Sequence, residues 1–186
     1  MKCGPWYRPG SEATPGGQVE QMPALRHAVF SRMTPDIFNR HPEKVAVANC
    51  AQLINCLNSL YLAHEDKFVI TPIGHVFELY ASHQGGQSLR TIFSAPNLHY
   101  DRDGQSASFW GLRGSTSVRE KNLTITAVNA HTSEPRLAEI SLRGASVKEA
   151  SISFLRTQTY THTIRSSNGS WLFLRQSVSA RQMGIL

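Results

Sequence analysis

The residues from Asn49 to Gln52 occupy the position at which a small α/β unit usually has its functional side chains. In residues 44–50, Val45 and Val47 alternate with alanines, which predicts a short strand with small residues on one face. A helical period follows over residues 53–62, where apolar residues repeat four and three positions apart. Because functional side chains gather at the carboxyl ends of strands in such units, we expect a site at Asn49 to Gln52.

Histidine side chains are the other candidates for a catalytic or metal-binding role. His75 and Tyr80 lie close together on a predicted short helix, residues 75–83, and resemble a catalytic pair. Their amphipathic context favours packing and surface positions instead. The remaining histidines show no ligand spacing, so the sequence predicts no metal site and no cofactor.

The elements that must position these residues divide the chain into two halves. The first half reads as helix, strand and helix. Pro35 predicts a kink or break near Thr34, late in the first helix. A polar connector, an extended segment ended by Pro72 and the short helix follow. The expected elements of this half are a helix at 19–39, a strand at 44–50, a helix at 53–62, a connector at 64–67 and extended chain at 68–71.

From about residue 89 the hydrophobic period changes from 3.6 to 2. Short alternating runs are separated by turn residues, including Asp103-Gly104, Arg113-Gly114 and Arg143-Gly144, which predicts an antiparallel β-sandwich. In the run at 123–129, leucine, isoleucine and alanine face one way while Thr124, Thr126 and Val128 face the other. The predicted strands are 89–94, 107–112, 123–129, 137–142 and 147–155.

Composition and charge indicate which partners and which cellular compartment to expect. The chain has 186 residues, is 40% hydrophobic and carries a net charge of +6, much of it in residues 141–186. No nucleic-acid-binding motif accompanies this basic tail, so we expect no nucleic-acid partner. The three cysteines (Cys3, Cys50 and Cys56) show no CxxC spacing, and the sequence predicts that Cys50 and Cys56 are reduced, packed thiols. No apolar run spans a membrane and no signal peptide is visible, which favours the cytoplasm.

The order of motifs between Asn39 and Gly85 resembles the C-terminal part of α-L-arabinofuranosidases of glycoside hydrolase family 51. The similarity covers roughly residues 4 to 145 and is strongest in the middle. The matching positions are Asn39-Arg40-His41, Lys44-Val45, Ala48-Asn49, Ala51-Gln52-Leu53, Asn55, Thr71-Pro72, His75-Val76-Phe77, Tyr80 and His83-Gln84-Gly85, with a departure at Gly74, where the family often has an aromatic residue.

This resemblance implies an α+β chain that holds the end of a (β/α)8 barrel followed by a C-terminal antiparallel β-sandwich. Residues 1–66 would be the last part of the catalytic barrel, with the end of strand 7, a helix, strand 8 and a helix. Residues 67–186 would be the sandwich, with helix 75–83 as the linker. The intact enzyme would remove terminal α-L-arabinofuranosyl groups from arabinan, arabinoxylan or their oligosaccharides.

The same resemblance assigns the site residues. Retaining glycosidases need two carboxyl groups roughly 5 Å apart. The family's acid/base residue would lie upstream of Met1, and Lys2 stands at the nucleophile position, so we expect the isolated chain to be inactive. Trp6 and Gln52 match residues that contact the sugar, and an aromatic face and an amide suit a neutral sugar.

Two further expectations concern partners. The resemblance implies an arabinose-containing glycan as the substrate and a homo-oligomer for the intact enzyme, with no membrane partner. The alternative is a non-catalytic β-sandwich module that binds carbohydrate or serves assembly. An orphan βα unit in the first 62 residues would have no use in such a module.

Overall fold

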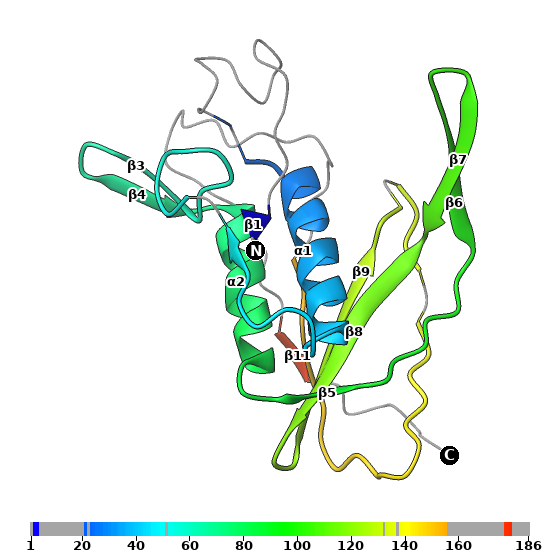
Figure 1. The fold of residues 1–186 in the computed structure, drawn as a ribbon. Coiled ribbons are helices and arrows are strands. Elements are labelled where there is room, and N and C mark those ends of the chain that lie inside the picture. Colours follow the sequence, from blue (N-terminus) through cyan, green and yellow to red (C-terminus); the bar gives the residue numbers. More distant parts are fainter. Residues whose placement is uncertain are drawn as a thin grey trace.

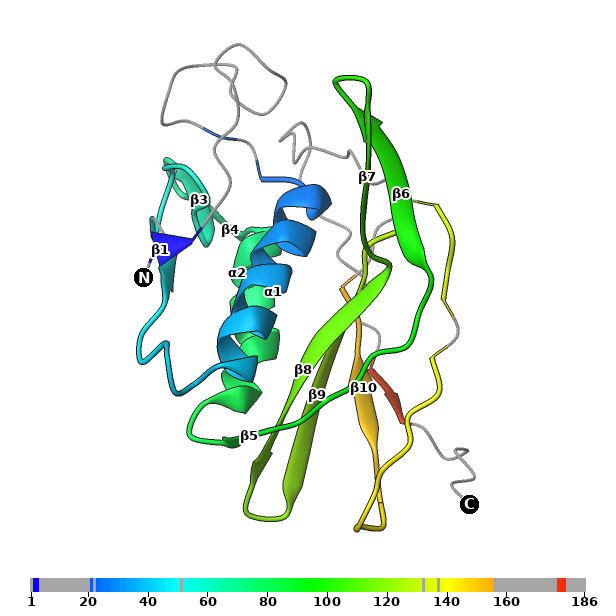
Figure 2. The same cartoon turned by 45° about the vertical axis from the view of Figure 1, so that its right-hand side comes forward.

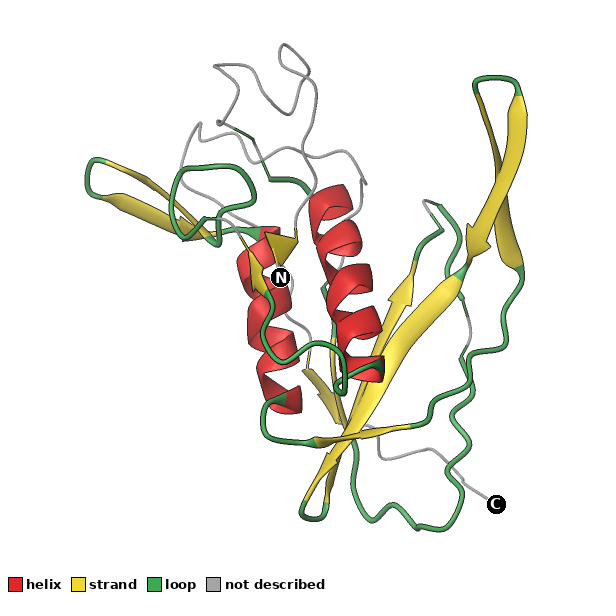
Figure 3. Cartoon of the chain, viewed as in Figure 1, coloured by secondary structure: helices red, strands yellow, loops and turns green. Residues whose placement is uncertain are grey.

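In the part of the chain that the structure describes, two α-helices and a set of short sheets form an α+β fold, which confirms the predicted class (Figures 1 and 3). The computed structural model describes residues 2–3, 21, 23–50, 52–131, 133–136, 138–155 and 177–179. In chain order the elements are β1 Lys2–Cys3, α1 Leu25–Arg40, β2 Asn49–Cys50, β3 Tyr61–His64, β4 Lys67–Ile70, α2 Pro72–Tyr80, the 3-10 helix η1 Ala81–His83, β5 Gln87–Leu89, β6 Asn97–Arg102, β7 Gln105–Trp110, β8 Leu112–Arg119, β9 Asn122–Asn129, β10 Ser151–Ser153 and β11 Ser177–Ser179.

Helix α1 is the central element of the first half. It continues through Pro35 to Arg40, so the break considered near Thr34 does not occur. Before its first turn, the backbone N–H of Ala24 donates to Nδ1 of the buried His27 at 2.8 Å, which satisfies one donor at the start of the helix. The helix then packs between α2 and strands β8 and β9 (Figure 2).

The predicted helix at 53–62 is wrong. Residues 53–60 form bends, and residues 61–70 form a β-hairpin of β3 and β4, whose turn lies in the predicted connector. Asn55 and Leu57 both have a φ of 52°, which an α-helix does not accept. The carbonyl of Leu53 instead accepts from the N–H groups of Leu60 and Tyr61 at 3.1 Å. Pairing with a later strand therefore overrides the local helical period.

The largest sheet has the strand order β5-β8-β9 and is antiparallel throughout. Strand β9 confirms the prediction for 123–129, and its buried face is the one that holds Thr126 and Val128. The turn predicted at Arg113-Gly114 is wrong, because both residues lie inside β8. A Cβ at Gly114 would overlap the carbonyl oxygen of Thr126, so glycine is required there by the close approach of the two strands.

The other strand predictions are met in part. The extended chain at 68–71 corresponds to β4, and the run at 147–155 contains β10. The run at 89–94 overlaps β5 only at Leu89, and the run at 107–112 is divided between β7 and β8. The described residues of 137–142 form no strand. Strand β6 was not predicted.

The apolar core is small and lies between the two helices. Ala28 of α1 packs with Val76 and Tyr80 of α2, and Leu155 from beyond β10 packs against them. Helix α2 begins three residues before the predicted helix, and η1 continues to its predicted end at residue 83. Because α1 also contacts the main sheet, the predicted parts 1–66 and 67–186 touch extensively, and their division stays a prediction. No helix among the described residues is long and apolar enough to cross a membrane.

Candidate functional site

Strands β1 and β2 pair in parallel and define the edge where a site is expected. Lys2 is in register with Asn49, and Cys3 is in register with Cys50. Parallel strands deliver their carboxyl ends to the same edge of a sheet, so the chain that follows Cys3 and the chain that follows Cys50 leave from one edge. Of the candidate residues, Trp6 lies outside the described residues, and only the backbone of Lys2 is described.

Gln52 lies in the loop directly after β2, and its side chain is exposed. Its backbone N–H donates to the carbonyl of Cys56 at 3.3 Å, which closes the loop on itself. Asn55 fastens this loop to β3. Its side-chain Nδ2 donates to the carbonyl of Ala63 at 2.7 Å, and its Oδ1 accepts from the N–H of Ala63 at 2.8 Å. The Asn55 amide thus pairs with β3 as a strand backbone would.

A buried polar network joins α1 to the main sheet. Asp36, which is 1% exposed, accepts hydrogen bonds at Oδ1 from the hydroxyls of Ser115 and Thr126, both at 2.8 Å. Asn39 Nδ2 donates to Ser115 Oγ at 3.2 Å, one helical turn further along. His83 reaches the same network, with Nε2 3.3 Å from Thr126 Oγ1. Residues far apart in sequence therefore converge on one carboxylate.

The partners of His83 assign its tautomer. The Thr126 hydroxyl hydrogen is used on Asp36, so Thr126 Oγ1 accepts and Nε2 of His83 carries the proton. Nδ1 of a neutral ring then accepts from the hydroxyl of Ser117 at 2.7 Å. Burial lowers the pKa of His83 below its ordinary value, and the negative charge of Asp36 partly opposes this shift. The imidazole is consequently a neutral structural group at pH 7.

The structure does not bring His75 and Tyr80 together as a catalytic pair. His75 Nδ1 lies 2.9 Å from Oε2 of Glu78 on the surface of α2. The Tyr80 hydroxyl instead donates to the carbonyl of Arg32 at 3.3 Å. Burial, reinforced by the nearby Asp36 carboxylate, raises the pKa of Tyr80 well above its ordinary value, so the phenol stays protonated. Tyr80 thus packs α2 against α1, whereas His75 stays on the surface of α2.

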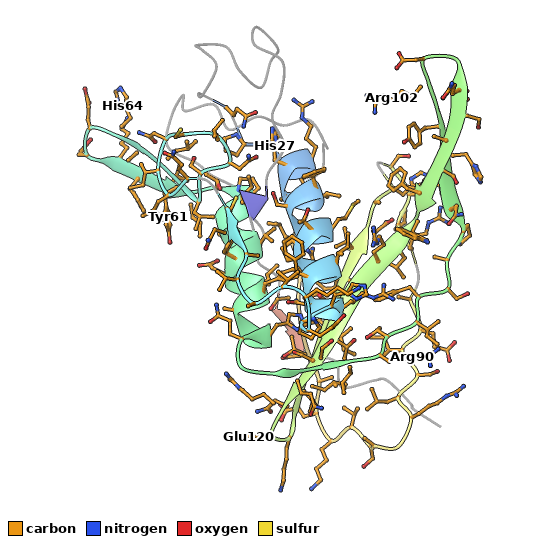
Figure 4. All side chains as sticks on the ribbon, in the orientation of Figure 1. His27, Tyr61, His64, Arg90, Arg102 and Glu120 are labelled. Carbon is orange, nitrogen blue, oxygen red and sulfur yellow. The ribbon has the colours of Figure 1, made fainter. Side chains whose placement is uncertain are left out.

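The histidines of the described residues are spread over the fold. Among them, no three histidine, cysteine or acidic side chains are grouped to hold a metal ion. Figure 4 places His27 near the amino end of α1 and His64 on the β3–β4 hairpin, so these two histidines belong to different parts of the fold. A cavity of about 210 Å³ lies between the two helices and is lined in part by Asn39, Tyr80 and His83. It adjoins the buried network.

Sequence reasoning missed the residues that organise this region. Asp36 and Ser115 have no local pattern that marks them, because their partners lie 79 and 90 residues away from Asp36. Asn55 was noticed only as part of the motif. Asparagine readily adopts a positive φ and pairs with backbone groups. An asparagine shortly after Gln52 was therefore the available signal that a loop, and not a helix, follows β2.

The comparisons with known proteins agree with the geometry. The sequence model of the α-L-arabinofuranosidase C-terminal domain matches residues 4–169. An intracellular exo-α-L-arabinofuranosidase of Bacteroides ovatus is 26% identical over 151 residues, which are 79% of this chain and 28% of that protein. The chain thus spans well under a third of the length of this curated relative.

Solved structures of family 51 enzymes share the fold. The arabinofuranosidase of Xanthomonas axonopodis pv. citri matches with a TM-score of 0.70 and 26% identity, over 86% of this chain and 31% of that chain. The enzyme of Thermotoga petrophila RKU-1 matches with a TM-score of 0.71 and 19% identity, over 96% of this chain and 38% of that chain. With the family match over most of its length, the chain belongs to the C-terminal domain family of the α-L-arabinofuranosidases of glycoside hydrolase family 51.

Proposed function

We propose that this chain is the C-terminal part of a retaining α-L-arabinofuranosidase that acts on arabinan, arabinoxylan or their oligosaccharides. The parallel pairing of β1 with β2 carries this proposal. A (β/α)8 barrel is built from parallel strands, whereas all other pairs of named strands in the described residues are antiparallel. A self-contained sandwich module has no use for such a pair, which disfavours the alternative of a non-catalytic binding or assembly module.

Gln52 and Trp6 are the sugar-contacting residues in this proposal. Support comes from the parallel register, which sends the chain after β1 and the chain after β2 to one edge. The exposed Gln52 amide offers both a donor and an acceptor to sugar hydroxyls, and the Trp6 indole offers an apolar face. The Asn55 pairing with Ala63 holds the Gln52 loop in place for this role.

The isolated chain is inactive in this proposal, because retaining hydrolysis uses a nucleophile and an acid/base carboxyl roughly 5 Å apart. Lys2 stands at the family's nucleophile position, and an ammonium group would repel an oxocarbenium-like centre. Asp36 does not substitute for either group, since it is buried against Ser115 and Thr126.

An activity assay tests the proposed inactivity of the isolated chain. Purified wild-type chain and the Lys2→Glu variant are incubated with an activated aryl α-L-arabinofuranoside. We expect no turnover above background from either, because one restored carboxylate leaves the second still missing. Turnover by either protein would overturn the proposal that the isolated chain is inactive.

A chimera tests the positive role. Residues 4–186 replace the matched C-terminal part of the Bacteroides ovatus relative, which supplies the upstream barrel. We expect hydrolysis of the aryl arabinofuranoside, and a loss of about tenfold or more in kcat/KM on Gln52→Ala, the size of one good polar contact. Gln87→Ala, an exposed glutamine on β5, is the matched control and should leave kcat/KM unchanged. Equal effects of the two substitutions would refute the role of Gln52.

The setting of the intact enzyme follows from the same proposal. We place it in the cytoplasm, in keeping with the word "intracellular" in the name of the Bacteroides ovatus relative. We further propose a homo-oligomer without nucleic-acid or membrane partners.

A further inference from the structure

One face of the β6–β7 hairpin displays a tryptophan within a row of polar side chains. Residues in register across an antiparallel pair share a face, so Trp110 shares one with Asn97, and the pairs His99–Ser108 and Asp101–Ser106 continue it. All six side chains are exposed. We call these six residues the Trp110 face.

The opposite face of the hairpin behaves differently. Leu98, Ala107 and Phe109 lie there and are half-buried, with Phe109 in an edge-to-face contact with Tyr100 at 5.8 Å. The hairpin therefore keeps its aliphatic residues on one side and displays polar groups with a single indole on the other. The tryptophan is not explained by packing of the hairpin's apolar side.

Trp110 is held in place although it is exposed. The indole is 57% exposed, and the guanidinium carbon of Arg113 lies 4.0 Å from its ring centroid. Stacking of a cation on one ring face restrains the indole and leaves its other surface accessible. A fixed, flat, apolar surface loses little entropy when a ligand binds to it.

The hairpin stands at the end of the molecule where the proposed active site lies. It forms its own two-stranded sheet and extends past the main sheet, toward the end at which α1 begins (Figures 1 and 2). In a βα unit the amino end of the helix lies at the carboxyl end of the preceding strand, where barrel enzymes carry their sites. Arg102 marks the tip of the hairpin in Figure 4.

We propose that the Trp110 face binds the main chain of a neutral arabinose-bearing polysaccharide, at the same end of the molecule as the site that takes the terminal arabinosyl group. The indole would stack on the apolar face of a sugar ring, and Asn97, Ser108 and Ser106 would bond its hydroxyls. Strand residues rise about 3.4 Å each, so the row from Trp110 to Ser106 spans about 14 Å and accommodates two or three consecutive sugar units. The choice of sugar class rests on the proposed function.

The chemistry of the face favours a neutral chain over an anionic one. Asp101 is its one carboxylate, and no lysine or arginine belongs to it. Two basic side chains lie next to the face: the Arg113 guanidinium stacks on the indole, and Arg102 pairs with Asp103 at 3.7 Å. A polyanion would meet Asp101 without a compensating cation from the face itself.

Affinity electrophoresis of the full 186-residue chain in gels that contain soluble arabinoxylan tests the proposal. We expect retardation of the wild-type chain, a drop of about tenfold in association constant for Trp110→Ala, and a smaller drop for Asn97→Ala, as loss of one stacking contact predicts. Gln105→Ala changes the opposite face of the same hairpin and should bind like wild type. Circular dichroism confirms that each variant is folded, and Trp110→Phe retains a ring if Trp110→Ala is unstable.

Other outcomes separate this inference from the proposed function. Equal retardation of wild type and both Trp110 variants, or no retardation of wild type, would overturn the inference that the Trp110 face binds the polysaccharide. Loss of binding in Gln52→Ala alone would place the binding in the proposed arabinosyl site instead. Stronger retardation by polygalacturonate than by arabinoxylan would show ionic binding and also refute the inference. Hydrolysis by the chimera is a separate measurement. An inactive chimera would count against the proposed function, and the electrophoresis results would still test binding by the Trp110 face.

Discussion

At the scale of single residues, Asp36 is the side chain on which the junction between α1 and the main sheet depends. It is buried and accepts from the Ser115 and Thr126 hydroxyls at 2.8 Å. Asp36→Ala would remove the acceptor of both hydroxyls and leave them only the longer bonds between Ser115 and Thr126, at 3.1 and 3.3 Å, so we expect the free energy of unfolding to fall by about 2 kcal/mol. Urea denaturation measures this change. Asp66→Ala, in the exposed β3–β4 turn, is the control and should change stability by less than about 0.5 kcal/mol.

His83 gives the same junction a pH dependence. Burial lowers its pKa, so the folded chain favours the neutral ring more than the unfolded chain does. This contribution to stability is complete above the unfolded pKa of about 6.5 and is lost as the pH falls from there toward the folded value. We expect the midpoint of thermal unfolding to decrease between pH 7.5 and pH 5, and His83→Gln to decrease less over that range. Parallel profiles for the two proteins would exclude His83 as the cause.

At the scale of elements, the loop after β2 depends on one side chain for its attachment to β3. Asn55 makes two hydrogen bonds with Ala63 and holds a φ of 52°. Asn55→Ala removes the bonds and disfavours this φ, whereas Asn55→Gly removes the bonds alone. We expect faster amide hydrogen exchange over residues 52–64 in both variants, with α1 unchanged. Unaltered exchange in that segment would show that the backbone bonds of Leu53 suffice.

At the scale of the whole molecule, side-chain hydrogen bonds hold α1 to the main sheet and to the chain just after β5. Arg32 Nη2 donates to the carbonyl of Ala127 at 2.9 Å, and Arg40 Nη2 donates to that of Thr91 at 3.2 Å, in addition to the Asp36 network. Lys44 is exposed in the connection between α1 and β2. We expect that, in chains cut after Lys44 by brief trypsin treatment, the piece with α1 co-elutes in gel filtration with the piece that holds β8 and β9. Release of the α1 piece in wild type would contradict this, and Asp36→Ala should promote release.

The sequence by itself determined the family, the class of fold and the places where regular structure is dictated locally. The motifs from Asn39 to Gly85 carry the family resemblance, which the family match over residues 4–169 confirms. Strand β9 was predicted because its period of two is local. The helix predicted at 75–83 corresponds to most of α2 and to η1, and its true start is set by local signals, the cap at Thr71 and the proline at position 72.

Only the tertiary structure decided how residues 53–62 fold and what Asp36 does. The helical period of Ile54, Leu57 and Tyr61 is real, but hydrogen bonds from β3 to Leu53 and Asn55 outweigh it. Asp36 finds its partners 79 and 90 residues away, a separation that no local pattern records. The exposure of Trp110 likewise depends on β6, the strand that pairs with β7. Such features are set by contacts between distant segments, and those contacts exist only in the folded chain.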